Sequence, residues 1–117
     1  MRILFVDNHP EFTDVVTRAF LSKHDVVVVA TIAGACGAAQ ASTFDVALVD
    51  YDLDDGKGDD FVRWVRATSA LRFPIIAVSA HADGNSALVR AGADHVCSKS
   101  EFSKIAALLD SALRARS

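Results

Sequence analysis

The sequence predicts an α/β domain in which helices cover both faces of a parallel sheet. Short apolar runs alternate along the chain with stretches in which apolar residues recur at helical spacing. The runs are unbroken, as expected of strands that are covered on both faces. Five such strand–helix units favour a doubly wound sheet, because right-handed crossovers leave few other arrangements. The length of 117 residues fits one domain with its own core.

Five strands are expected, and four of them are continuous apolar runs. These runs are residues 3–6, 26–29, 46–49 and 75–78, and each is interpreted as a strand buried on both faces. A fifth strand, shorter and less apolar, is expected at residues 95–97.

Helices are expected between these strands and near the end of the chain. Two stretches carry an apolar stripe with spacings of three and four residues: Phe12, Val15, Val16, Ala19 and Phe20 in the first, and Phe102, Ile105, Ala106, Leu109, Ala112 and Leu113 in the second. Shorter patterns predict helices around residues 61–65 and 87–91, and the small residues of 33–41 predict a helix that lies close to the sheet. Gly92 is expected to end a helix, and Ser100 to cap the last one.

Composition and charge exclude several classes of protein. With 15 acidic and 12 basic side chains and no basic stripe, the chain is not expected to bind nucleic acid directly. A hydrophobic content of 51% excludes intrinsic disorder. Cys36 and Cys97 show no metal-binding spacing, so both are expected to be buried thiols in a reducing cytosol. No apolar run suits a signal peptide or a membrane span, and we expect a cytoplasmic protein without membrane contact.

Polar residues of complementary chemistry follow four of the predicted strands. Asp7 and Asn8 end the first strand, Asp50 ends the third, Ser79 ends the fourth, and Lys99 follows the fifth. Ligands of parallel sheets bind at this carboxyl edge. Carboxylate oxygens suit Mg²⁺, and a lysine and a metal ion beside an aspartate can offset the charge of a phosphoryl group during in-line attack. The set predicts phosphoryl transfer to an aspartate.

Four segments in this order, residues 3–10, 47–53, 77–80 and 92–99, resemble the receiver domain of two-component response regulators. The resemblance covers essentially the whole chain and depends on the set of motifs. It implies one receiver domain over residues 1–117 with a flavodoxin-like fold of strand order 2-1-3-4-5. It also implies a signalling protein of a phosphorelay, whose only catalysis is its own phosphorylation and dephosphorylation. The implied partners are a sensor histidine kinase or a histidine phosphotransfer protein, and a downstream target protein.

The resemblance also implies roles for single residues. Asp50 would be the phosphoacceptor, Ser79 the switch hydroxyl, and Lys99 the contact to the phosphoryl group and the carboxylates. The metal ion would be Mg²⁺, with Mn²⁺ able to replace it. Its ligands would be Asp7, Asn8, Asp50 and the backbone carbonyl of Asp52.

Further positions would shape the same site. Ala80 would leave room for the phosphoryl group, and Asp52 and His81 would flank it and modulate its hydrolysis. Gly58 matches the glycine that opens the third helix. The face formed by the fourth helix, the fifth strand and the fifth helix would be the output surface. His9, His24 and His95 are expected to be ordinary surface or loop residues, because no metal-binding spacing joins them.

Three residues depart from the family pattern. Asn8 stands where a second acid is usual, so weaker Mg²⁺ binding is expected. Val96 replaces an aromatic residue that couples the site to the output surface, and it is expected to be a core valine of the last strand. Ser100 replaces a proline, which makes the geometry of the Lys99–Ser100 bond less certain.

Two alternatives remain at this point. Asn8, Val96 and Ser100 favour a pseudo-receiver, an interaction module of the same fold that phosphorylation does not control. The run Asp50-Tyr51-Asp52-Leu53 also resembles the first motif of haloacid-dehalogenase-type phosphohydrolases, with Asp50 as nucleophile and Asp52 as general acid. That motif usually follows the first strand of a longer chain, whereas here it follows the third.

Overall fold

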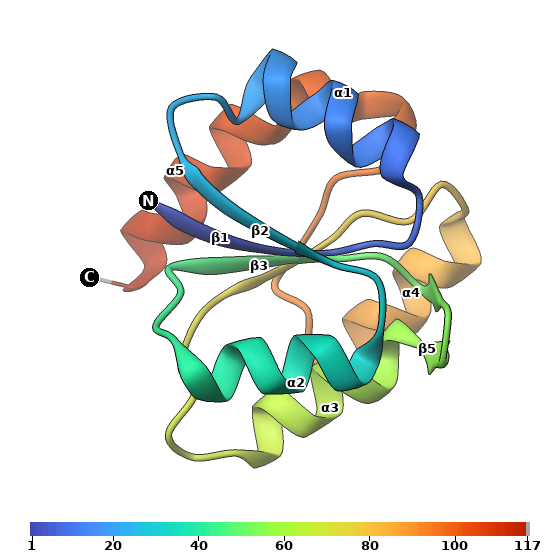
Figure 1. Ribbon diagram of the computed structural model, residues 1–117, viewed down its shortest axis with the longest axis vertical. Coiled ribbons are helices and arrows are strands. Elements are labelled where there is room, and N and C mark those ends of the chain that lie inside the picture. The colour runs from blue at the N-terminus through green and yellow to red at the C-terminus, as the bar shows by residue number, and fades with distance from the viewer. Residues whose placement is uncertain (117) are drawn as a thin grey trace.

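Five parallel strands form the central sheet of the computed structural model, in the order β2-β1-β3-β6-β7 (Figure 1). Their bounds are Arg2–Val6 for β1, Asp25–Val29 for β2, Val46–Val49 for β3, Ile75–Ala77 for β6 and His95–Val96 for β7. The structure describes the backbone of residues 1–116 and the side chains of residues 1–114. Because β4 and β5 lie outside this sheet, its order is the predicted 2-1-3-4-5, and the doubly wound, flavodoxin-like architecture is confirmed.

Helices cover both faces of the sheet, as predicted. One face carries α1 (Pro10–Phe20) and α5 (Ile105–Arg116), and the other carries α2 (Ile32–Ala41), α3 (Gly58–Ala67) and α4 (Ala82–Ala91) (Figure 1). Among the described residues, none of the helices combines the length and the apolar content that crossing a membrane requires.

Apart from Arg2, the central strands β1, β3 and β6 are apolar at every position, because each face of the sheet has its own core. Successive side chains of a strand point to opposite faces. In β1, Leu4 and Val6 pack in the core beneath α2 and α3, whereas Ile3 and Phe5 pack in the core beneath α1 and α5. The Phe5 ring stacks on Phe102 at a centroid distance of 6.0 Å. Burial on both faces is thus confirmed for β1, and β3 and β6 are buried in the same way.

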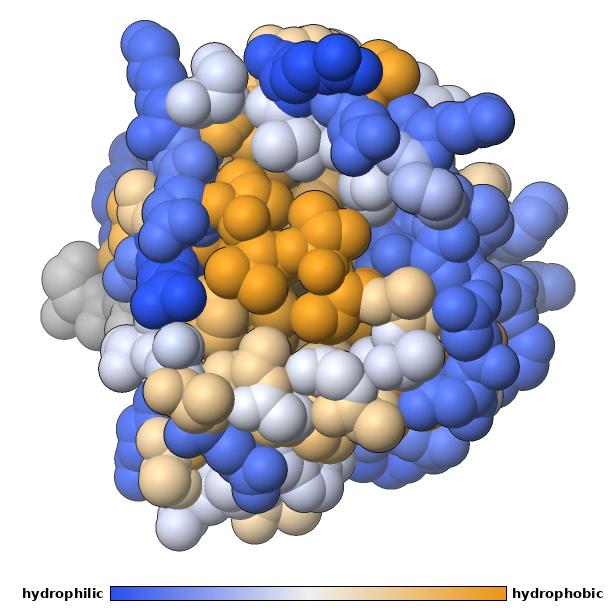
Figure 2. Space-filling model, in the orientation of Figure 1, coloured by the Kyte–Doolittle hydropathy of each residue, from blue (hydrophilic) through white to orange (hydrophobic). Residues whose placement is uncertain are grey.

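The apolar run of β2 has a different environment from the one predicted. This strand pairs only with β1 at the edge of the sheet, and none of its residues is fully buried. Val27 and Val29 are partly buried against one core, and Val26 against the other. Val28 is 46% exposed. Figure 2 shows hydrophobic residues gathered on the surface where β2 runs in Figure 1. An apolar run therefore identified the strand but not its place in the sheet.

The apolar stripe predicted for the first helix also does not coincide with the side of α1 that is buried. Val16 is buried as expected. The other buried residue of α1 is the polar Thr13, whereas Val15 is 59% exposed. Phe12 and Phe20 both contact the Phe102 ring, at centroid distances of 5.4 and 6.0 Å. Packing against this ring orients α1 and leaves Val15 in solvent.

The last helix begins later than its sequence suggests. A 3₁₀ turn, Lys99–Lys104, precedes α5, and Ser98 is the residue before that turn. Ser100 lies inside the turn, so its predicted role as a helix cap is wrong. The described residues contain no cis peptide bond, and the Lys99–Ser100 bond is therefore trans.

A short hairpin that the sequence did not predict adjoins the carboxyl end of β3. It consists of β4 (Asp52–Leu53) and β5 (Gly56–Lys57), which pair antiparallel. The carboxylate of Asp55, in its turn, accepts the backbone N–H groups of Ile32 and Ala33 at 2.7 and 3.1 Å. These bonds tie the hairpin to the first turn of α2, and they lower the pKa of the Asp55 carboxyl.

Candidate functional site

The polar residues predicted at the strand ends meet at the carboxyl edge of the sheet. Asp7, Asp50 and Ser79 directly follow or lie close to the ends of β1, β3 and β6, and all three are buried. The backbone N–H of Asp50 donates to the Val6 carbonyl at 2.8 Å. This bond extends the pairing of β1 and β3 by one residue and so holds the backbone of Asp50 at the edge of the sheet. Sequence reasoning correctly brought these residues together.

The Lys99 ammonium lies between the two buried carboxylates. Its Nζ atom is 3.0 Å from Asp7 Oδ2 and 3.0 Å from Asp50 Oδ2. The same Nζ lies 4.7 Å from the centroid of the Phe12 ring, whose face attracts a cation. Burial raises the pKa of the Asp50 carboxyl; the Lys99 ammonium opposes this shift, and the Asp7 charge adds to it. Lys99 and the backbone N–H of Tyr51, which donates to Asp50 Oδ1 at 2.8 Å, therefore both favour the ionised form of Asp50.

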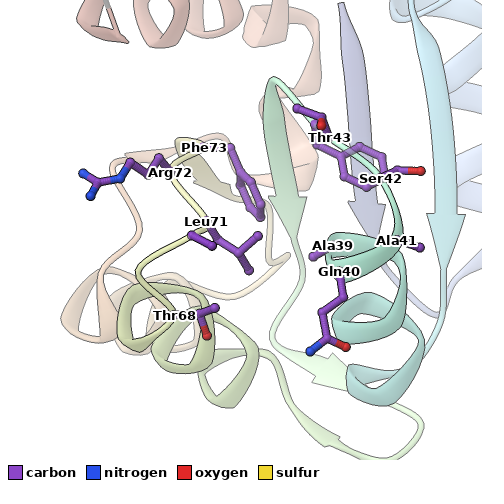
Figure 3. A pocket seen from close by; sticks show the side chains of 11 residues that line it. Ala39, Gln40, Ala41, Ser42, Thr43, Thr68, Leu71, Arg72 and Phe73 are labelled. Carbon is purple, nitrogen blue, oxygen red and sulfur yellow. The ribbon is translucent and has the colours of Figure 1, made fainter.

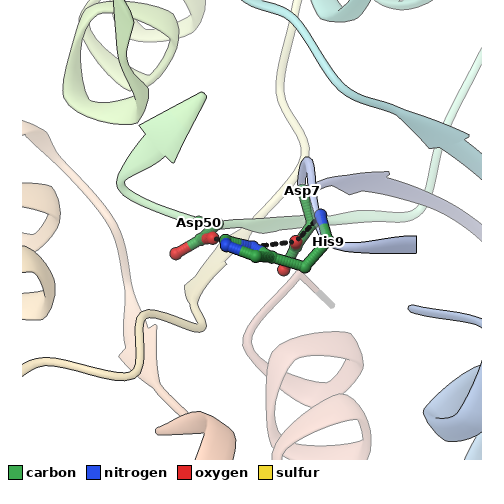
Figure 4. A group of neighbouring side chains, drawn as sticks. All are labelled: Asp7, His9 and Asp50. Carbon is green, nitrogen blue, oxygen red and sulfur yellow. Dashed lines mark hydrogen bonds and ion pairs between the residues drawn. The ribbon is translucent and has the colours of Figure 1, made fainter. Parts of the chain in front are cut away.

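His9 is an exposed loop residue, as expected, but its imidazole is also part of the site, which was not expected. Its Nδ1 atom lies 3.0 Å from Asp7 Oδ1, 3.3 Å from Asp50 Oδ2 and 3.1 Å from Lys99 Nζ (Figure 4). The backbone N–H of His9 also donates to Asp7 Oδ1 at 2.8 Å. This two-residue turn folds the imidazole back over the carboxylates. The signal in the sequence was the position of His9, two residues after Asp7 at the end of a strand.

Only one of the two polar side-chain atoms of Asn8 has a hydrogen-bond partner among the described residues. Its side-chain Nδ2 donates to Asp54 Oδ1 at 3.0 Å, whereas its Oδ1 atom is buried and accepts no hydrogen bond from any described residue. Leaving a buried acceptor unpaired costs free energy. A cation at this edge of the sheet would satisfy the Asn8 oxygen, so the residues present fit a divalent metal ion.

Ser79 is held by Asn85, a residue that sequence reasoning missed. The Asn85 Oδ1 accepts the backbone N–H of Ser79 at 2.9 Å, and Asn85 Nδ2 donates to the Ser79 carbonyl at 3.1 Å. Asn85 lies on α4 and is 5% exposed. The Ser79 hydroxyl accepts the backbone N–H of His81 at 3.2 Å. Only the packing of α4 shows that Asn85 points inward, so the sequence carried no clear signal for it.

Two glycines let the backbone come close to the site. A Cβ atom at Gly58 would lie 1.9 Å from the Asp50 carbonyl oxygen, and one at Gly84 would lie 2.6 Å from Ser79 Oγ. Real Cβ atoms do not approach other atoms so closely, so a larger side chain would displace Asp50 or Ser79. Gly58 is the first residue of α3, as predicted.

A cavity of about 380 Å³ opens above Asp50. The predicted modulators Asp52, Ala80 and His81 line it together with Ser79 and Lys99. The Asp52 carboxylate is exposed and pairs with Lys57, and this ion pair lowers its pKa. Asp52 thus stays ionised and bonded elsewhere, which disfavours the role of general acid that a phosphohydrolase would need.

A larger cavity, of about 690 Å³, lies at the opposite, amino edge of the sheet (Figure 3). Its lining includes Phe44, which precedes β3, and Leu71 and Phe73, which precede β6. No carboxylate, imidazole or thiol belongs to this lining. Although this cavity is the larger one, its lining therefore lacks the carboxylates found at the carboxyl edge.

Val96 does not lie in the core. It is 41% exposed on β7, the strand at the other edge of the sheet, so the prediction of a core valine is wrong. Shallow pockets on either side of it are lined by Val89 and Arg90 of α4 and by Ala107 and Leu108 of α5. Val89 and Val96 are exposed on this surface among polar residues that include Ser98 and Glu101.

Comparisons with known proteins agree with this architecture. The family model of the response regulator receiver domain matches residues 3–110, and the chain belongs to that family. Receiver domains are signalling modules of two-component systems rather than typical enzymes. No curated protein matches the sequence.

Solved structures show the same fold at low identity. A putative response regulator from Chloroflexus aurantiacus J-10-fl has a TM-score of 0.88 and 18% identity, with 97% of each chain covered. A sensor protein from Polaromonas sp. JS666 has a TM-score of 0.88 and 21% identity, with 99% of this chain and 98% of that chain covered. The response regulator TrrA from Thermotoga maritima, solved in complex with Mg²⁺-BeF, has a TM-score of 0.85 and 19% identity over 96% of this chain and 98% of its own.

Proposed function

We propose that Asp50 of this receiver domain accepts a phosphoryl group from a phosphohistidine of a sensor histidine kinase or a histidine phosphotransfer protein. The observation that carries the proposal is the buried Asp50 carboxylate, which faces a cavity and lies 3.0 Å from the Lys99 ammonium. A buried carboxylate with a raised pKa and a charged partner in a cavity is a typical reacting group. The phosphorylated domain then signals through contacts with a downstream protein.

The transfer uses the residues of the carboxyl edge. A carboxylate oxygen of Asp50 forms a bond to phosphorus while the bond from phosphorus to the donor imidazole nitrogen breaks, and its electron pair stays on that nitrogen. Lys99 offsets the charge of the phosphoryl oxygens. The Ser79 hydroxyl turns toward the phosphoryl group and donates a hydrogen bond to it. Asp52 and His81 stand at the mouth of the cavity, where they influence the access of water to the acyl phosphate.

The same edge is proposed to hold Mg²⁺, with Mn²⁺ able to replace it. The ligands would be the carboxylates of Asp7 and Asp50, the side-chain oxygen of Asn8 and the backbone carbonyl of Asp52. The unpaired, buried Asn8 Oδ1 supports this set, although an amide oxygen brings no charge and weaker binding is expected. When bound, the metal ion supplies positive charge beside the phosphoryl oxygens.

The surface between α4 and α5 is the proposed output surface. Val89 and Val96 are large apolar residues exposed there, and exposed apolar patches often mark protein contacts. Because Val96 is short and already at the surface, it cannot move inward as a large aromatic ring does. The Ser79 and Asn85 hydrogen bonds connect the site to α4 and supply another route for the signal.

The test is the intact mass of the chain after incubation with acetyl phosphate and MgCl₂. We expect the wild type and Asp52→Asn, a matched control that retains the backbone carbonyl, to gain one phosphoryl group. Asp50→Asn should gain none, and omission of Mg²⁺ should prevent the gain in every chain. A gain in Asp50→Asn would refute the assignment of Asp50. No gain in any chain would favour a pseudo-receiver, for which the uncharged Asn8 is the main structural argument.

A further inference from the structure

His9 adds a nitrogen ligand to the two carboxylates of the carboxyl edge. One ligand atom from each of Asp7, His9 and Asp50 lies within 4.8 Å of the other two (Figure 4). Such a group can surround one metal ion. The backbone bond from His9 N–H to Asp7 Oδ1, at 2.8 Å, holds the turn that brings the imidazole to this position.

A cation already lies among these three side chains. Lys99 Nζ is 3.0 Å from Asp7 Oδ2, 3.0 Å from Asp50 Oδ2 and 3.1 Å from His9 Nδ1. An ammonium group only donates hydrogen bonds, whereas the Asp7 and Asp50 carboxylates, 3.0 and 3.3 Å from the same Nδ1 atom, only accept them. The tautomer that bonds to Lys99 is the one whose Nδ1 atom carries a lone pair. That lone pair is the group with which a neutral imidazole binds a metal ion. The contact between Lys99 Nζ and His9 Nδ1 therefore shows that a positively charged group can lie within 3.1 Å of this imidazole nitrogen.

The composition of the site favours metal ions that accept nitrogen. Mg²⁺ prefers oxygen ligands and carboxylate charge, and Asn8 supplies no charge. Imidazole suits Fe²⁺, Ni²⁺, Cu²⁺ and Zn²⁺, and Mn²⁺ is the weakest-binding ion of the same series. Mn²⁺ also takes the oxygen ligands that suit Mg²⁺, so both ions can be compared at one site. The imidazole of His9 is 54% exposed, so solvent and ions reach it from the cavity mouth.

We propose that His9 is a direct ligand of the divalent cation and shifts the preference of the site from Mg²⁺ towards transition metal ions, with Mn²⁺ as the probe. The inference rests on the proposed function, because it requires a cation at the acidic edge. Nδ1 of His9 would hold the ion together with the carboxylates of Asp7 and Asp50, whose charge Lys99 balances in its absence.

The experiment measures Mn²⁺ bound to the purified chain by pulsed electron paramagnetic resonance, which detects a nitrogen nucleus directly bonded to the metal ion. The test variant is His9→Phe, which keeps a planar ring and removes both nitrogens. The matched control is His81→Phe, which removes the histidine on the other side of the same cavity. Isothermal titration with Mn²⁺ and with Mg²⁺ gives the two dissociation constants, and heteronuclear NMR spectra establish that each variant is folded.

We expect nitrogen coupling in the wild type and in His81→Phe, and none in His9→Phe. Mn²⁺ binding should weaken about tenfold or more in His9→Phe, while Mg²⁺ binding changes less than about threefold. Bound Mn²⁺ without nitrogen coupling in the wild type, or with coupling that persists in His9→Phe, would overturn the role of His9 and leave the proposed function intact. No binding of Mn²⁺ or Mg²⁺ by the wild type would remove the cation site itself, and with it both proposals.

Discussion

The two edges of the sheet are formed by opposite ends of the same strands, and they differ in how their charged groups are paired. At the carboxyl edge, the buried carboxylates of Asp7 and Asp50 lie near each other, and one ammonium group balances both. At the amino edge, Arg66 donates to the carbonyl oxygens of Gly92 and Phe73 at 2.9 and 3.1 Å and pairs with Asp94 at 2.7 Å. At the amino edge the Arg66 guanidinium is matched by these acceptors, whereas the carboxyl edge keeps excess negative charge. Excess negative charge at the carboxyl edge is what the proposed binding of a divalent cation there requires.

The largest effect is expected from Lys99→Met, which leaves the two carboxylates without their partner. Removing one member of a buried ion pair costs about 3 kcal/mol or more of the free energy of unfolding. A divalent cation should restore part of this loss, because it can take the place of the ammonium. Urea denaturation of the wild type and Lys99→Met, with and without MgCl₂, measures both quantities.

The same variant sharpens the comparison between the edges. If Lys99→Met proves as stable as the wild type without metal ions, the carboxyl edge does not carry the excess charge described above. Acetyl phosphate should label Lys99→Met at least about tenfold more slowly, because the charge that stabilises the transferred group is missing.

A smaller loss of stability is expected from Arg66→Ala at the amino edge. The carbonyl oxygens of Gly92 and Phe73 lose their donor, and the free energy of unfolding should fall by about 2 kcal/mol. Phosphorylation should remain at the wild-type rate, because the amino edge is the opposite end of the sheet. The matched control is Arg63→Ala, whose exposed guanidinium pairs only with the nearby Asp59 and Asp60 of the same helix among the interactions described for it. A slower phosphorylation of Arg66→Ala than of Arg63→Ala would show that the two edges are coupled.

The smallest effect is expected from Asp55→Asn, in the hairpin beside the site. Backbone N–H groups of Ile32 and Ala33 lower the pKa of the Asp55 carboxyl in the folded state. A lowered pKa contributes stability above the ordinary carboxyl pKa of about 3.9, and this contribution is lost as the pH falls through the lowered value. Asp55→Asn should therefore lose less stability than the wild type when the pH falls from neutral to acid. The midpoint of thermal unfolding at several pH values measures this difference, and equal losses would contradict it.

The sequence predicted the parts of the molecule that depend on local pattern. Buried runs such as residues 3–6 and 46–49 identified strands, and the residues that follow them identified the carboxyl edge. The pattern could not distinguish the edge strand β2 from a central one, because four valines are apolar in either place. The two-residue strands β4 and β5 are too short to show any periodicity.

The details that the sequence did not predict depend on contacts between distant segments. Asn85 acts on Ser79 because α4 packs with that side inward, and the orientation of a short helix with a weak stripe is not evident from its residues. His9 reaches Asp50 because a tight turn joins β1 to α1. Val96 is exposed because β7 closes the sheet at one edge. In each case the residue type was visible, but its neighbours were set by tertiary packing.

The most direct test of the account is to locate the phosphoryl group in the phosphorylated chain. Borohydride reduces an aspartyl phosphate to homoserine, and mass spectrometry of the resulting peptides identifies the residue that was modified. The account predicts homoserine at residue 50 alone, formed only after incubation with a phosphoryl donor and Mg²⁺. Homoserine at residue 7, 52 or 54, with Asp50 unmodified, would contradict it.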